Sequence, residues 1–260
     1  MTTVAGATAA AAIRLPGGVD PRALENHLGG AAAANYRRFE LDLVSPYCGR
    51  RILEVGSGLG EFAAGLRGYD YLTVSDTDTF CLQTLRDRFA GRADVDVVAL
   101  DVAGVAAGFE AGVEAGGRVV PVDTLIMMNV LEHVDDDVAA LRRLGSLVSP
   151  GGRVVLWVPA YPALYGEFDR MVDHFRRYTP ATLRARVHSA GLRVERLGPV
   201  NLLGGIAWWA AVRCAGQRSA DPRLVGVYDR IVVPTTRFIE RWTKVPFGQS
   251  LLCVAALPTA

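Results

Sequence analysis

A glycine-rich segment preceded by a carboxylate is the first feature of this sequence that could do chemistry. Glu54 is followed by Gly56, Gly58 and Gly60 in the run ILEVGSGLG at 52–60. Glycine adopts backbone angles closed to other residues and leaves no Cβ between the main chain and a ligand. The spacing therefore predicts a turn whose backbone closely approaches a bound small molecule.

Two aspartates could bind the polar groups of that molecule. Asp76 follows the glycine turn by about 20 residues, the place of a ribose-binding acid in nucleotide-binding folds. A carboxylate can accept hydrogen bonds from both ribose hydroxyls. Asp101 ends the next apolar run. Asp78 competes with Asp76, but it could simply cap a helix expected over 79–89, so we expect Asp76 to be the ribose ligand.

Alternating strands and helices must position these residues. Apolar runs that are typical of buried parallel strands lie at 51–55, 71–76, 95–100, 122–128 and 153–159. With helices between them, this alternation predicts a doubly wound α/β sheet. Gly56, Asp76 and Asp101 would then meet at the carboxyl ends of three strands, where open α/β sheets bind ligands. A helix expected over 61–66 would direct its free N–H groups at the turn.

A nicotinamide dinucleotide fits this turn less well. Its fingerprint, G-x-G-x-x-G/A, requires a third small residue where this chain has Glu61. At the start of a helix, that carboxylate would face the pyrophosphate and repel it. A nicotinamide-dependent oxidoreductase is therefore the less favoured enzyme class.

The segment from Glu54 to Gly60 resembles the first motif of class I S-adenosylmethionine-dependent methyltransferases. The run Asn129-Val130-Leu131-Glu132-His133-Val134 is similar to the signature that follows the fourth strand in small-molecule members, and Pro150-Gly151-Gly152 resembles the turn before their fifth strand. The resemblance covers 34–199. It implies a Rossmann-like, seven-stranded, mostly parallel sheet with helices on both faces, and S-adenosylmethionine as the cofactor. The cofactor-binding residues it implies are Glu54, Gly56, Ser57, Gly58, Gly60, Asp76, Thr77, Asp101, Val102, Asn129 and Val130.

A long polar and aromatic loop, 159–178, would lie above the cofactor. His174 is the candidate general base, because an imidazole accepts a proton near neutral pH, and Tyr165 is a weaker catalytic candidate. Alternatively, His174 and Arg177 hold the loop in shape by hydrogen bonds, as we expect His133 to do for its own turn. The candidate acceptor-binding residues are Tyr36, Tyr161, Tyr165, His174, Arg177 and Trp208.

The region 200–245 interrupts the α/β pattern before a final strand. We expect a tail without fixed structure at 1–15, an S-adenosylmethionine-binding domain with an N-terminal helical segment at 16–199, a helical apolar insertion at 200–245, and the last, antiparallel strand within 246–260. The insertion could cap the acceptor, form a homodimer contact or touch a membrane surface. Its adjacent Trp208 and Trp209 would point in different directions on a helix.

Composition and charge limit the kinds of partner, metal site and location that the sequence is expected to have. The net charge is +1 with both signs scattered, which disfavours nucleic-acid partners. The longest late apolar run, 202–212, is too short for a transmembrane segment. The four cysteines lack metal-ligand spacing, so no metal is expected. Without a secretory signal, a cytoplasmic location is expected.

The resemblance implies an enzyme that methylates a small acceptor, which we expect to be hydrophobic or aromatic and natural-product-like. Oxygen is favoured over nitrogen or carbon only because a base candidate is present. Arginine supplies every basic residue except Lys244, a bias typical of GC-rich bacterial genomes, in which secondary metabolism is a reasonable setting. A protein that binds S-adenosylmethionine without methylating anything remains the alternative from another class, because binding and transfer share the same motifs.

Overall fold

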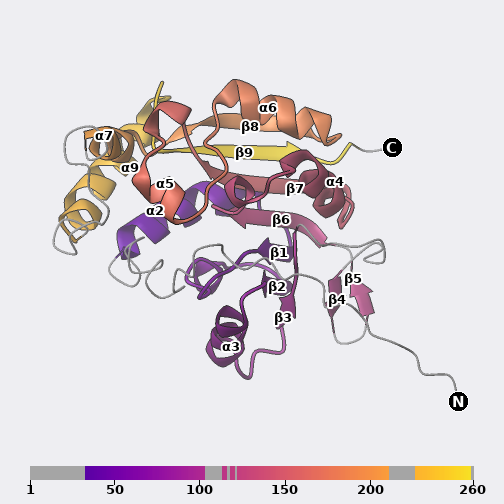
Figure 1. Ribbon diagram of the computed structural model, residues 1–260. Helices are drawn as coiled ribbons and strands as arrows, with labels where there is room; N and C mark the ends of the chain where they lie inside the picture. The colour runs from indigo at the N-terminus through magenta and orange to yellow at the C-terminus, as the bar shows by residue number, and fades with distance from the viewer. Residues whose placement is uncertain (1–32, 103–112, 116–117, 121, 211–225, 259–260) are drawn as a thin grey trace, which may run out of the picture.

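The computed structural model describes residues 33–102, 113–115, 118–120, 122–210 and 226–258. A seven-stranded sheet runs through the middle of the molecule, with helices on both sides (Figure 1). Its strand order is β3-β2-β1-β6-β7-β9-β8. The strands are β1 (Arg51–Val55), β2 (Tyr71–Asp76), β3 (Val95–Ala99), β6 (Val122–Met128), β7 (Val148–Pro159), β8 (Arg193–Val200) and β9 (Ser250–Ala256).

The sheet has the mixed character that the sequence predicts. Strands β3, β2, β1, β6 and β7 pair in parallel, whereas β9 pairs antiparallel with β7 and with β8. The central strands are buried on both faces, and Leu53, Leu125 and Leu156 have no exposed surface. Near-continuous apolar runs are what such doubly covered strands require. The predicted α/β sheet and its antiparallel last strand are therefore confirmed.

Helices α3 (Thr79–Arg88), α4 (Asp137–Gly145) and α6 (Pro180–Ser189) connect the strands. Asp78 caps α3 through hydrogen bonds from the backbone N–H groups of Phe80 and Cys81. Thr179 caps α6 by accepting from the N–H of Thr182, with Pro180 as the first helical residue. The capping role considered for Asp78 is therefore confirmed.

The segment after the glycine turn differs from the expectation. Instead of a helix over 61–66, the chain forms one short 3₁₀ turn, η3 (Ala63–Gly65). Phe62, Ala63 and Leu66 are buried, and the chain leaves the turn at Leu66 in an extended conformation with ψ 145°. The expected helix N-terminus at the turn is therefore wrong.

The Pro-Gly-Gly turn forms a bulge within β7 rather than a loop before it. Val122 pairs with Val148 and Thr124 with Arg153, so the extra residues loop out between two paired positions. Gly151 has φ +79°, and a Cβ on Gly152 would approach the backbone oxygen of Asp123 to 2.8 Å. Only glycine fits this crowded return of the chain.

The insertion is helical where it is described. It contains α7 (Leu202–Ala210), the π-helical η7 (Tyr228–Val232) and α9 (Val233–Trp242). The N-terminal helix α2 (Ala34–Val44) lies beside this group, and Asp229 of η7 accepts hydrogen bonds from the N–H groups of Asn35 and Tyr36. The expected tail at 1–15 and the start of the N-terminal helical segment lie outside the described residues. No helix in the described ranges is both long enough and apolar enough to span a bilayer.

Candidate cofactor and acceptor site

The glycine turn after β1 has the backbone that its sequence predicts. Gly56, Gly58 and Gly60 have φ values of +69°, +54° and +79°, in the left-handed region that favours glycine. A Cβ on Gly56 would approach Cγ2 of Val130 to 2.5 Å, whereas one on Gly58 would meet nothing within 4 Å. Gly56 therefore allows close packing, and Gly58 leaves open space beside the turn.

Asp76, at the end of β2, is joined to this turn. Its Oδ2 accepts from the N–H of Gly58 at 2.9 Å, and its Oδ1 accepts from the N–H groups of Thr77 and Asp78 at 2.8 and 2.9 Å. Burial raises the pKa of Asp76 above its ordinary value, although these three hydrogen bonds act in the opposite direction. The carboxylate is thus held rigidly at the sheet edge and retains acceptor capacity.

The third strand also ends at this edge. The N–H of Leu100 donates to the backbone oxygen of Asp76 at 3.1 Å, and this places Asp101 next to the end of β2. Asp101 is half-buried, while Val102 lies within the apolar core. The structure therefore brings the glycine turn, Asp76 and Asp101 together, as the sequence predicts.

Glu54 is a buried acid below the turn. Its side chain is 2% exposed, and Oε2 has no hydrogen-bond partner among the described residues. Burial raises the pKa of Glu54 to about 7. Hydroxyls of Ser57 and Ser75 donate to its backbone oxygen and link β1 to the turn and to β2.

The raised pKa predicts a pH-dependent stability that Glu54→Gln removes. Between pH 4.5 and 7 the folded protein holds a proton on Glu54 that the unfolded chain releases, so the free energy of unfolding falls as pH rises through this window. The slope from this residue is at most about 1.4 kcal/mol per pH unit. Urea unfolding at pH 5, 6 and 7 should show a shallower decline in Glu54→Gln than in the wild type. Equal slopes would contradict the prediction.

Asn129 and Val130 close the other side of the turn. Asn129 has φ +53°, uncommon for a residue with a side chain, and its N–H donates to the backbone oxygen of Trp157 at 2.8 Å. This bond fixes the chain as it leaves β6, so that Val130 packs over Gly56. Both predicted residues thus lie beside the glycine turn.

The loop beyond β7 is organised around the buried carboxylate of Asp169. Its Oδ1 lies 2.7 Å from Nδ1 of His174 and accepts from Nε of Arg177 at 2.8 Å, while Oδ2 accepts from the N–H of Gly166. The hydrogen bonds from His174 and Arg177 lower the pKa of Asp169 against the effect of burial. The predicted hydrogen bonding of this loop by His174 and Arg177 is present.

The other predicted acceptor-site residues lie around this network. The hydroxyl of Tyr165 donates to the backbone oxygen of His174 at 2.7 Å, and Trp208 Nε1 donates to that of Leu164 at 3.1 Å. The guanidinium of Arg177 lies over the Trp208 ring. Tyr161 stacks on Phe247. The helix α7 therefore packs on the loop through Trp208, whereas Trp209 is half-exposed.

Tyr36, the remaining candidate for acceptor binding, lies on α2. Its ring lies near Phe39, which is 3% exposed and packs edge-on against Trp157. Phe39 is therefore a core residue. A contact between Tyr36 and an acceptor stays a prediction.

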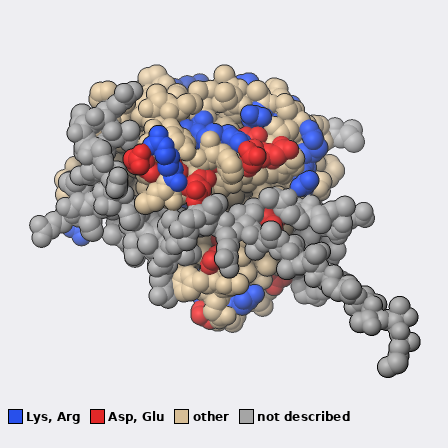
Figure 2. All heavy atoms as spheres, in the orientation of Figure 1, with Lys and Arg blue, Asp and Glu red and all other residues tan. Residues whose placement is uncertain are grey.

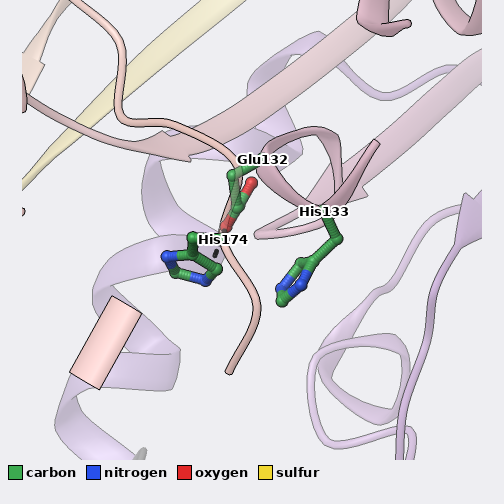
Figure 3. A group of neighbouring side chains, drawn as sticks. All are labelled: Glu132, His133 and His174. Atoms are coloured by element: carbon green, nitrogen blue, oxygen red, sulfur yellow. Dashed lines mark ion pairs between the residues drawn. The ribbon is translucent and has the colours of Figure 1, made fainter. Parts of the chain in front are cut away.

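Reasoning from the sequence did not foresee the convergence of Glu132, His133 and His174 (Figure 3). Possible ligand atoms of the three side chains all lie within 4.8 Å of one another. Burial raises the pKa of Glu132 to about 7, and burial together with His174 lowers the pKa of His133 to about 3. The signal was present in the adjacent Glu-His pair, but its partner is 41 residues away and only the fold brings it close.

Charged groups of both signs lie side by side on the face of the molecule shown in Figure 2. Among the described residues, Arg170 pairs with Glu167, and Arg176 pairs with Asp135 and Asp137. Arg176 also donates to the backbone oxygen of Val134 and so holds the turn after β6. This face presents pairs of opposite charge rather than a field of one sign.

The fold, with its glycine turn, Asp76 and Asp101 at one edge of the sheet, is that of a class I methyltransferase-like protein. Residues 24–197 match the family model described as "Methyltransferase domain", and the chain belongs to this family. An uncharacterized methyltransferase of Mycobacterium tuberculosis and one of Mycobacterium bovis are each 31% identical to it over 131 residues. The match covers 48% of this chain and 58% of each relative, so the chain spans little more than half the length of these proteins.

Solved structures of low sequence identity share the fold. An S-adenosylmethionine-dependent methyltransferase from Mesorhizobium loti has a TM-score of 0.55 and 16% identity, and the match covers 88% of this chain and 99% of that one. The [4+2]-cyclase SpnF has a TM-score of 0.54 and 17% identity, with 86% and 81% covered. CalH, solved in complex with S-adenosylhomocysteine, has a TM-score of 0.52 and 20% identity, with 86% and 57% covered.

Proposed function

We propose that this protein transfers the methyl group of S-adenosylmethionine to a small, hydrophobic or aromatic acceptor. The observation that carries the proposal is the Asp76 carboxylate joined to the N–H of Gly58, which presents an acid and an open glycine backbone at one point of the sheet edge. Glu54 is buried in β1 just before the turn, and Asp101 and Asn129 follow β3 and β6 at the same edge of the sheet. Membership of the methyltransferase domain family supports the same ligand.

The structure changes the argument against a dinucleotide cofactor. Glu61 pairs with Arg88 of α3 and does not stand at a helix N-terminus, so the expected repulsion of a pyrophosphate is not its role. The segment after the turn is a single 3₁₀ turn, however, and it lacks the helix N-terminus on which dinucleotide phosphates are bound. S-adenosylmethionine carries no phosphate and therefore does not need a helix N-terminus at this position.

The insertion supports an acceptor pocket. Trp208 of α7 contacts the loop that holds His174 through Leu164, Phe168 and Arg177. A helix in this position can cover an apolar acceptor and exclude water, and methyl transfer requires the nucleophile, methyl carbon and sulfur to be held in line in a dry site. Ile206, Trp209, Phe238 and Trp242 are at least half-exposed on the insertion, so a homodimer through this surface also stays a prediction.

His174 is proposed to support turnover. Its Nδ1 is bonded to Asp169, and this leaves Nε2 as the nitrogen that could accept a proton. We expect His174→Ala to keep S-adenosylmethionine affinity within about twofold and to lose at least about tenfold in turnover, or about 1.4 kcal/mol of barrier. Formation of S-adenosylhomocysteine, measured with a panel of phenols, carboxylic acids and amines, tests both the activity and the variant.

Two outcomes would redirect the proposal. Near-normal turnover in His174→Ala would remove the base role. Tight S-adenosylmethionine binding without methylation of any acceptor class would favour a protein that uses the ligand as a scaffold. The similarity to the [4+2]-cyclase SpnF keeps this second function in view, because the fold alone does not decide the reaction.

A further inference from the structure

The side chains of Glu132, His133 and His174 leave unsatisfied polar atoms facing one another inside the protein. Glu132 has no exposed surface, and neither of its carboxylate oxygens has a hydrogen-bond partner among the described residues. Nδ1 of His133 is likewise buried without a partner there. Isolated buried polar atoms of this kind are costly, because each has lost its hydration without replacement. Their convergence calls for a group that satisfies several of them at once.

The hydrogen bond between His174 and Asp169 leaves the other ring nitrogen of His174 facing Glu132. The Asp169 carboxylate holds Nδ1 of His174, so that nitrogen carries the proton and Nε2 is free, 3.8 Å from Oε1 of Glu132. Nδ1 of His133 is buried and has no hydrogen-bond partner among the described residues. Metal-binding histidines characteristically have their second nitrogen held by a carboxylate or a backbone carbonyl.

We propose that Glu132, His133 and His174 form a binding site for a divalent transition-metal ion of the Zn²⁺ type. Two imidazoles and one carboxylate are a donor set found in catalytic zinc sites, which leave a further position open. The donor atoms already lie within 4.8 Å of one another, and the two rings stand nearly perpendicular with centroids 4.6 Å apart. Zinc bonds of about 2.0–2.2 Å require the side chains to draw slightly closer, by small rotations.

The local charge favours a cation. Arg177 neutralises Asp169 through a direct ion pair in which both side chains are buried. Glu132 makes no such direct contact: the nearest basic atom is the His174 Nε2 at 3.8 Å, which is uncharged when Nδ1 alone carries a proton. An ion would therefore compensate the Glu132 carboxylate, which is otherwise the least compensated charge of the cluster.

The position of the site suggests the ligand that the open coordination position would take. Glu132 and His133 belong to η4 (Leu131–His133), which directly follows the Asn129-Val130 segment packed on the glycine turn. If the proposed methyl transfer is correct, an acceptor oxygen is the ligand that belongs here. When the ion is bound, His174 Nε2 serves as its ligand in place of the base role, because one lone pair cannot serve both, and the loss of turnover expected in His174→Ala would then come from loss of the ion.

Cobalt titration of metal-free protein tests the site without any cofactor or acceptor. After dialysis against a chelator, Co²⁺ is added and its visible absorption is followed, because four- and five-coordinate Co²⁺ absorbs far more strongly than the hydrated ion. We expect one equivalent to bind to the wild type and Zn²⁺ to displace it. Glu132→Gln and His133→Ala should each weaken binding at least about 100-fold. His188→Ala, which removes an exposed histidine on α6, is the matched control and should bind as the wild type does.

Each outcome decides the proposal. No absorption change in the wild type would overturn it and leave Glu132 as a buried neutral acid. Binding of equal strength in the wild type and in both site variants would place the ion elsewhere and would also overturn it. Circular dichroism tests whether each variant is folded. If Glu132→Gln does not fold, the result for His133→Ala decides alone, because the His133 side chain is only half-buried. Because S-adenosylmethionine is absent, failure here is distinct from failure of the proposed methyl transfer.

Discussion

Replacement of Asp76 by alanine is expected to weaken S-adenosylmethionine binding at least about 100-fold, or about 2.7 kcal/mol. The variant would lose the charge-assisted hydrogen bonds from the ribose hydroxyls to the carboxylate, each contributing about 1.5–3 kcal/mol. It would also lose the bond from the Gly58 N–H that fixes the glycine turn. Equilibrium dialysis with labelled S-adenosylmethionine measures the change directly.

Asp78→Ala is the matched control for this experiment. Asp78 is two residues away and also accepts backbone hydrogen bonds, but its role is to cap α3. Its loss should lower the free energy of unfolding by about 1 kcal/mol and leave ligand affinity nearly unchanged. Equal affinity in Asp76→Ala and the wild type would show that the ribose is bound elsewhere.

Replacement of Asp169 by alanine is expected to lower the free energy of unfolding by about 3–5 kcal/mol. The side chain has no exposed surface, and the Arg177 side chain beside it is 3% exposed. Removing the acid leaves the guanidinium charge buried without its partner, and also removes the acceptor for the Gly166 N–H. Urea unfolding followed by circular dichroism gives the value.

Glu167→Ala offers the comparison on the same short helix, α5 (Glu167–Met171). Glu167 also pairs with an arginine, Arg170, but both side chains are more than half-exposed. Solvent screens such pairs, so the loss should be below about 0.5 kcal/mol. If Asp169→Ala were as mild as this control, the buried network would not be holding the loop.

The parts of the fold that depend on local pattern could be predicted from the sequence. Buried parallel strands appear in the sequence as short apolar runs. The runs at 51–55, 71–76 and 95–100 therefore allowed the ends of β1, β2 and β3 to be placed at one edge of the sheet. Caps at Asp78 and Thr179 follow from chemistry within a few residues. The positions of Asp76 and Asp101 beside the glycine turn follow from these elements.

Features that depend on distant contacts could not be predicted in the same way. The 61–66 segment has helix-favouring residues, but burial of Phe62, Ala63 and Leu66 under neighbouring elements overrides that preference. His133 was expected to hold its own turn, yet its ring meets Val172 and His174 from a loop that begins more than 25 residues later. The spacing of residues in the sequence does not indicate which ring nitrogen of His133 lacks a hydrogen-bond partner.

The most direct test of the account is calorimetric titration of the wild-type protein with S-adenosylhomocysteine and, separately, with NADH. The site described here predicts one molecule of S-adenosylhomocysteine bound with a micromolar or lower Kd, about −8 kcal/mol or more favourable, and no heat of binding from NADH. Binding of NADH without binding of S-adenosylhomocysteine would contradict the assignment of the glycine turn and, with it, the proposed methyl transfer.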